Sequence, residues 1–282
     1  MHGTVDDFGY GLVTPLVGYL MACLGGALGL RCTARALCVP GSRRPGWLAL
    51  GAAAIVSGTW TMHVVGMMGF TIDGAPIRYD RPTTYASLLL AVVMVGVGIF
   101  IVGYRGATGS ALFTGGTITG LGIASMHYLG MAGIHFDGAF EYNTLTVAAS
   151  VLVAMAAATA VLWVAGTAGR PLRSIGASLV MGVAAGGMHY AGMGAVSVHV
   201  HGAIAASGKS PAALLAPLLI GPLALLLLAG VVVLLDPLTI KGRGGWTPVD
   251  RRPGVPAPRL PAPSAVHPDP PAARRPHTPQ QH

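Results

Sequence analysis

The sequence has few charged residues and few cysteines. Charged side chains make up 9% of its 282 residues, against about 25% in a typical soluble domain. With 53% apolar residues and 42 glycines, this composition excludes an ordinary soluble protein and favours membrane helices. Cys23, Cys32 and Cys38 do not indicate a disulfide framework, because the last two fall in a predicted cytoplasmic connection where thiols stay reduced.

Other absences limit the chemistry that we expect. The sequence shows no nucleophile paired with a base and no glycine-rich phosphate loop, so we do not expect an enzyme. The only lysines, Lys209 and Lys241, lie outside the apolar runs, which disfavours a retinal Schiff base. The net charge of +8 does not predict nucleic-acid binding, because the basic residues follow a membrane-topology pattern.

Seven apolar runs are each long enough to cross a membrane as a helix, which takes about 20 residues. They cover about 8–30, 47–68, 84–104, 111–133, 144–166, 174–196 and 212–235. None has an Asp, Glu, Lys or Arg away from its ends. The predicted fold class is therefore an all-α membrane protein with seven transmembrane helices, and the lipid bilayer is its expected partner.

Basic residues fall mainly on alternate connections between these runs. Of the 17, only Arg78, Arg81 and Lys209 lie on the opposite side, which leaves 14 on the rich side. The positive-inside rule places the rich side in the cytoplasm. We therefore expect a multi-pass protein of the bacterial cell membrane, with its N-terminus outside and its C-terminus in the cytoplasm.

The composition changes after the last apolar run. Residues 236–282 contain 12 prolines and almost no large apolar residues after Trp246. Such a segment cannot bury enough apolar surface to fold. We predict a seven-helix membrane domain over 1–235 and a disordered, basic, proline-rich cytoplasmic tail over 236–282.

One six-residue pattern, Met-His-x-x-Gly-Met, occurs three times, at Met62–Met67, Met126–Met131 and Met188–Met193. Its first Met recurs after 64 and then 62 residues, which indicates an internal repeat. Two crossings return the chain to the same side of the membrane. The pattern therefore predicts three parallel helix-pair repeats plus one extra helix, with all three motifs at the outer ends of helices.

The motif residues are suited to binding a metal ion. In a helix, the His and the second Met of each copy lie four residues apart on one face. Imidazole and thioether together favour copper. The predicted metal ligands are His63, His127, His189, Met62, Met67, Met126, Met131, Met188 and Met193. Candidate supporting partners or further ligands in the outer connections are His135, His199, Asp73 and Asp137.

Several alternatives stay open at this point. A duplicated helix pair also repeats its packing residues, and Met, Gly and a hydrogen-bonded His all serve helix packing. The pattern does not decide between one shared site and several separate ones. A metal transporter is the alternative function, with Met21, Met94, Met155 and Met181 near mid-span. Haem with His and Met axial ligands is a less favoured cofactor.

The sequences Met126-His127-Tyr128 and Met188-His189-Tyr190 resemble the signature of the MHYT family of bacterial integral membrane sensor domains. The resemblance extends over about residues 10–235. It implies a metal-binding module, with copper suggested, that senses oxygen, carbon monoxide, nitric oxide or redox state. Family members often carry cytoplasmic cyclic-di-GMP enzymes or other signalling domains. This chain departs from the pattern at Val64 and shows no output domain, so the implied partner is a separate cytoplasmic signalling protein.

Overall fold

The structure, a computed structural model, describes residues 2–3, 5–6, 9–39, 41–72, 75–167, 171–200 and 211–236. Its long helices are α1 (Val13–Cys38), α2 (Arg44–Met68), α3 (Arg81–Arg105), α4 (Gly109–Ala132), α5 (Thr144–Thr167) and α6 (Pro171–Gly194). A last helical segment combines α7 (Pro211–Leu215), the 3-10 helix η1 (Ala216–Leu219) and α8 (Ile220–Leu235). The predicted tail lies outside the described residues except for Asp236.

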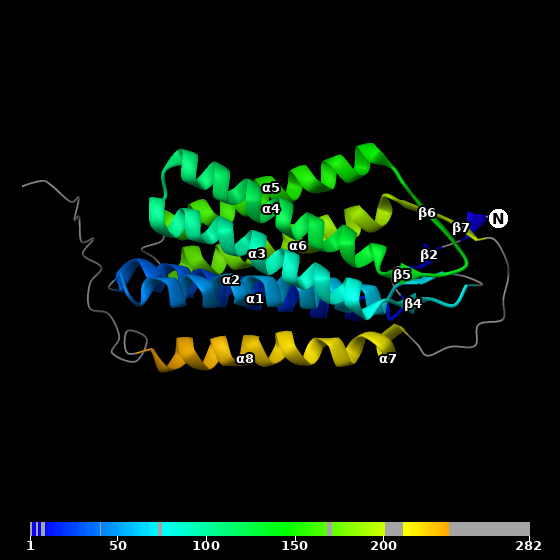
Figure 1. Ribbon diagram of the computed structural model, residues 1–282, viewed down its shortest axis with the longest axis horizontal. Coiled ribbons are helices and arrows are strands. Elements are labelled where there is room, and N and C mark those ends of the chain that lie inside the picture. The colour runs from blue at the N-terminus through cyan, green and yellow to red at the C-terminus, as the bar shows by residue number, and fades with distance from the viewer. Residues whose placement is uncertain are drawn as a thin grey trace, which may run out of the picture. The chain divides into compact units, whose positions relative to one another are not determined.

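These seven helical segments run alongside one another (Figure 1). Five are long and apolar enough to cross a membrane: α1, α2, α3, α5 and the segment from α7 to α8. Among the described residues, α4 and α6, with 24 residues each, are not among these five. The described chain is therefore a mostly helical multi-pass membrane protein, and seven spans stay a prediction.

Short strands gather at one end of the helices (Figure 1), and the all-α prediction missed them. They are β1 (His2–Gly3), β2 (Val5–Asp6), β3 (Thr71–Ile72), β4 (Arg78–Tyr79), β5 (Ile134–His135), β6 (Gly138–Tyr142) and β7 (Val196–Val200). They form one three-stranded sheet in the order β1-β7-β6 and two pairs, β2-β3 and β4-β5, all antiparallel. Connections that we expected to be irregular thus pair with one another across the repeats.

Each motif occupies the last two turns of its helix, as the sequence predicted. The helix α2 ends at Met68, where the Gly69 amide donates to the Gly66 carbonyl and the Phe70 amide donates to the Met67 carbonyl. The helix α4 ends in the same way, at Gly133. Since the strands follow directly, all three motifs lie at the strand end of the helices.

Equivalent caps begin α3 and α5 and fix the register of the repeat. The Asp80 carboxylate accepts hydrogen bonds from the Thr83 hydroxyl and, at 2.9 Å, from the Thr83 amide. These bonds stabilise the charged form and lower the pKa of Asp80. At α5, Asn143 accepts from the Thr146 amide at 3.1 Å. The two caps are 63 residues apart, so a residue of α3 corresponds to the residue of α5 that follows it by 63.

The first helix is longer than predicted. We expected its apolar run to end near Leu30 and to leave Cys32 and Cys38 in a loop, but α1 continues to Cys38 and buries Cys32. No proline or glycine occurs between Leu30 and Pro40, so the helix continues and carries its arginines on its final turns. There Arg35 forms an ion pair with Asp236 at 2.9 Å, which joins the ends of α1 and α8.

Glycines bring the first two motif helices close to their neighbours. A Cβ on Gly58 of α2 would lie 2.7 Å from the Cα of Gly25 in α1. A Cβ on Gly122 of α4 would lie 2.6 Å from the Cβ of Met94 in α3. Both distances are too short for a real side chain, so these glycines permit the close helix packing that is common in membranes.

Candidate metal centre

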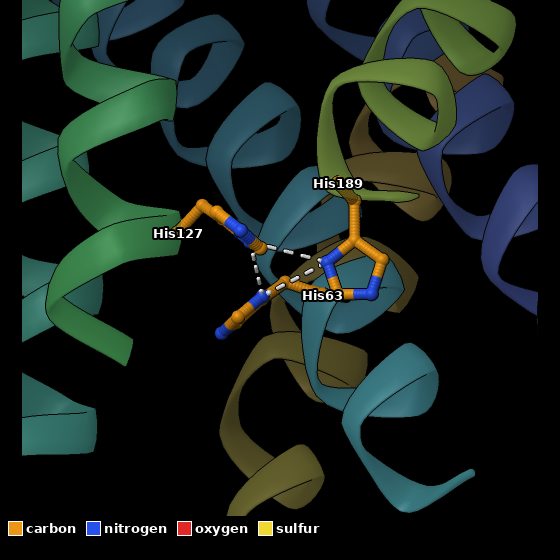
Figure 2. Close-up of side chains that lie close together, drawn as sticks. All are labelled: His63, His127 and His189. Carbon is orange, nitrogen blue, oxygen red and sulfur yellow. Dashed lines mark hydrogen bonds between the residues drawn. The ribbon is translucent and has the colours of Figure 1, made fainter. Parts of the chain in front are cut away.

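His63, His127 and His189 come together at the strand end of the helices. They project from α2, α4 and α6 and point toward one another (Figure 2). Their exposed fractions are 2%, 0% and 1%, so the cluster is almost fully buried. A buried histidine within a membrane segment is costly unless something compensates it. The structure thus joins the three predicted histidines in one cluster rather than in three separate places.

The Nδ1 atoms of the three rings form a nearly equilateral triangle. His63 and His127 are 3.2 Å apart at Nδ1, His127 and His189 are 3.2 Å apart, and His63 and His189 are 3.3 Å apart. The ring planes are inclined at 81°, 83° and 78° to one another, with centroids 5.0 to 5.3 Å apart. All three rings therefore direct the same atom to one central point.

Hydrogen bonds alone cannot satisfy this triangle. A ring nitrogen of a neutral imidazole either carries a proton or offers a lone pair. A hydrogen bond needs one nitrogen of each kind, and three nitrogens in a closed triangle must include at least one like pair. A cation that accepts all three lone pairs removes this conflict and leaves the protons on Nε2.

The size of the triangle also suits a metal ion. With sides of 3.2, 3.2 and 3.3 Å, its centre is about 1.9 Å from each Nδ1. Bonds from imidazole nitrogen to a metal such as zinc are about 2.0–2.1 Å long. The buried cluster can therefore bind one metal ion, with each histidine supplying one ligand atom. Nitrogens this close leave no space between them for a haem macrocycle.

The opposite edge of each ring lies against the motif glycine of the next helix. A Cβ on Gly130 would overlap Nε2 of His63, one on Gly192 would overlap Nε2 of His127, and one on Gly66 would overlap Nε2 of His189. This cyclic pattern explains why Gly is part of the motif. The sequence indicated only that this Gly permits close packing; the structure shows which side chain it admits.

The motif methionines are buried among apolar side chains. Met62 lies against Gly18 of α1 and packs with Ala22 and Ala185. The other five, Met67, Met126, Met131, Met188 and Met193, belong to the main apolar core. A ligand role for them stays a prediction.

The candidate supporting residues lie beyond the helix ends. His135 is exposed on β5 and donates from Nδ1 to the Gly133 carbonyl at 3.2 Å. Asp137 is also exposed, and His199 on β7 lies 3.8 Å from the Glu141 carboxylate. Asp73 lies outside the described residues. The structure therefore places three of the four among the strands, and their supporting role stays a prediction.

The missing tyrosine of the first motif has a structural counterpart. The Tyr128 hydroxyl is 2.6 Å from Ser150 Oγ on α5. In the first repeat Val64 replaces Tyr, and Trp60 Nε1 instead donates to Ser87 Oγ on α3 at 3.2 Å. Ser87 and Ser150 are 63 residues apart, so both bonds reach the same repeat position. The spacing of the two serines is the sequence signal for this contact.

The Tyr128–Ser150 bond should stabilise the packing of α4 on α5. We expect Ser150→Ala to lower the free energy of unfolding by about 1–3 kcal/mol, because it leaves the tyrosine hydroxyl unpaired. Tyr128→Phe should cost less, and the double variant should be no less stable than Ser150→Ala alone. Unfolding titrations in detergent measure all three. Strictly additive losses would show that the two hydroxyls do not interact.

The comparison with known families agrees with this geometry. The sequence model of the MHYT family, described as a bacterial signalling protein N-terminal repeat, matches residues 57–115 and 120–178. Both matches contain a histidine of the cluster. The third motif lies beyond the matched residues. Its His189 nevertheless belongs to the cluster, with Nδ1 3.2 Å from Nδ1 of His127.

Curated relatives are bacterial signalling proteins. The chain is 35% identical over 205 residues to the bifunctional diguanylate cyclase/cyclic di-GMP phosphodiesterase MucR of Pseudomonas aeruginosa. That match covers 71% of this chain and 30% of MucR. The chain is 33% identical over 190 residues to the cyclic di-GMP phosphodiesterase NbdA of the same organism, covering 65% and 24%. The signaling protein YkoW of Bacillus subtilis is 28% identical over 197 residues, with 67% and 24% covered.

The chain thus spans less than a third of the length of these relatives. Their catalytic activities are therefore not carried over to it. No solved structure matches this chain. The two family matches, the relatives and the shared position of the motif histidines lead to one identification: the chain belongs to the MHYT family of membrane signalling proteins.

Proposed function

We propose that this chain is a membrane-embedded sensory module in which His63, His127 and His189 hold one copper ion through Nδ1. The observation that carries the proposal is the buried Nδ1 triangle, which hydrogen bonds cannot satisfy. Copper loading of the purified protein under reducing conditions, followed by metal analysis, tests it. A folded protein that retains no metal would contradict it.

Two features support copper as the ion. Imidazole suits copper, and the thioethers of Met67, Met131 and Met193 follow the histidines by one helical turn on the same face. Zinc, by contrast, is normally bound by Cys, His or carboxylate. When bound, copper supplies a redox-active centre with a coordination position for a small ligand. The burial of the three rings excludes water, and the glycine contacts hold the rings in orientation.

The stimulus in this proposal is a diatomic gas, namely oxygen, carbon monoxide or nitric oxide, or the redox state. MucR and NbdA are similar to this chain over 205 and 190 residues, and their names describe enzymes of cyclic di-GMP turnover. Here the output passes to a separate cytoplasmic signalling protein. The helix end opposite the histidines suits this role, because Arg35 links α1 to the start of the C-terminal segment at Asp236.

Metal transport is the alternative function. It requires a path of ligands across the membrane below the cluster. Two of the methionines considered for that path pack against glycines of neighbouring helices, Met94 against Gly122 and Met181 against Gly26. These contacts are those of helix packing, so the sensory proposal is preferred.

The orientation of the module in the membrane leads to a labelling prediction. Cys38 is exposed at the end of α1 opposite the strands, and Asp137 is exposed among the strands. In a Cys23→Ser/Cys32→Ser variant, a membrane-impermeant thiol reagent should miss Cys38 in intact cells and label it after permeabilisation. Adding Cys38→Ser and Asp137→Cys should give labelling in intact cells. The reverse pattern would place the histidine cluster on the cytoplasmic side.

A further inference from the structure

A cavity lies one helical turn from the histidine cluster. It has a volume of about 30 Å³ and lies between α2, α4, α5 and α6. Thr59, Ile123 and Ala185 line it, and each precedes the cluster histidine of its own helix by four residues. One turn of helix rises about 5.4 Å. The cavity therefore lies directly below the three imidazoles, on the side away from the strands.

The cavity arises where the third repeat differs from the second. In the second repeat, Met94 of α3 packs closely against Gly122 of α4. The corresponding residues of the third repeat are Ala157, which follows Met94 by 63 residues, and Ala184, four residues before the motif Met188. Both alanines line the cavity. A short side chain on α5 thus leaves unfilled the space that a methionine fills in the other repeat.

The residues that line the cavity offer few hydrogen-bond partners to a water molecule. Its two polar residues are Thr59 and Thr119, and the rest are apolar. The Thr59 hydroxyl already donates to the Ile55 carbonyl at 3.0 Å. The Thr119 hydroxyl lies against Gly98 of α3, a helix that does not line the cavity. A buried water needs about two to four polar partners, and a water-sized sphere needs about 10–15 Å³. The cavity therefore suits an apolar occupant of about two such spheres.

The side of the cavity between α5 and α6 faces the membrane. Ala157 and Ala184 are half-buried there, and their neighbours Val153 and Val183 are 48% and 65% exposed. Apolar molecules dissolve better in hydrocarbon than in water, so the bilayer concentrates them at this surface. The lining residues Ala157 and Ala184 at this point have small side chains.

We propose that this cavity is a binding site for one apolar molecule of one or two heavy atoms, the size of a diatomic gas. The molecule enters from the lipid between Ala157 and Ala184 and lies one turn from the imidazoles. The inference deepens the proposed function, on which it rests for the presence of a metal beside the cavity. It gives the module a specific internal site for its small ligand, separate from the histidines.

Xenon is a probe of the right size and polarity for this site. Crystals of the full chain pressurised with xenon should show one anomalous peak in the cavity, in contact with Thr59. Ala157→Met, which restores the residue of the second repeat, should lower the xenon occupancy by more than about tenfold because it fills the space. The matched control is Ala156→Met, an exposed position on the same helix that should leave the occupancy unchanged.

Two results would overturn the proposal: no xenon in the wild-type cavity, or undiminished xenon in Ala157→Met. If that variant does not fold, Ala184→Leu fills the cavity from the α6 side and is expected to give the same loss. Metal analysis of the same samples separates this proposal from the metal centre. A protein that takes up xenon but no metal contradicts the centre alone, and one that binds metal but no xenon contradicts the cavity alone.

Discussion

Replacing any one of His63, His127 and His189 by Ala is expected to remove nearly all bound copper, a loss of more than about tenfold in metal per folded protein. The physical reason is that the three Nδ1 atoms are 3.2–3.3 Å apart and share one centre. Two remaining ligands in an apolar site cannot replace the water that the ion has to lose. Metal analysis after copper loading under reducing conditions measures the loss.

The control for this prediction is His135→Ala, an exposed histidine among the strands, which should keep its full metal content. The outcome also distinguishes one shared site from three. If each single variant lost only about a third of the metal, the histidines would be serving separate sites. If stability fell while the metal-to-protein ratio stayed constant, the motif would be serving helix packing only.

The motif glycine Gly192 is not a metal ligand, but replacing it is expected to weaken copper binding nearly as much as replacing a histidine. Gly192→Ala places a Cβ on top of Nε2 of His127 and must displace that ring from the triangle. Since packed interiors absorb such overlap only by shifting, we expect a cost of about 1–3 kcal/mol in stability. Copper affinity should fall by more than about tenfold although every ligand is retained. Titration with a copper(I) chelator of known affinity measures this change.

The matched control is Gly187→Ala on the same helix, where an added Cβ meets no atom within 4 Å among the described residues. Both changes raise helix propensity equally. Gly187→Ala should therefore keep its copper affinity, and its stability should not fall. If both variants bound copper as well as the wild type, the contacts between glycine and histidine would have no role in orienting the rings.

Part of this arrangement could be predicted from the sequence. The spacing of Met62, Met126 and Met188 placed the motifs on one side of the membrane, and all three lie at the strand end of their helices. Whether the histidines share a site depends on how each helix is rotated about its axis. That rotation is set by contacts such as Gly58 with Gly25, between residues 33 positions apart, which periodicity does not reveal.

The strands and the end of α1 could not be predicted for different reasons. The strand β1 pairs His2 with His199, which lie far apart in the sequence. A strand of two residues is too short to show an alternating pattern that would predict it. The alternation Val196-Ser-Val-His-Val200 is a local strand signal, but the prediction ends a helix at Val196 and assigns the residues after it to an outer connection. The apolar run predicts a loop at Arg31 and Arg35, whereas the helix continues through both and carries their charged ends beyond the apolar layer.

The most direct test of the shared metal centre is the number of copper ions bound per chain by the folded wild-type protein. Copper(I) is added under reducing conditions, excess is removed with a weak competing chelator, and metal and protein are quantified in the same sample. Three Nδ1 atoms around one point predict a ratio of one. A ratio of three would show that the repeats bind copper separately, and a ratio of zero would show that the cluster is not a copper site.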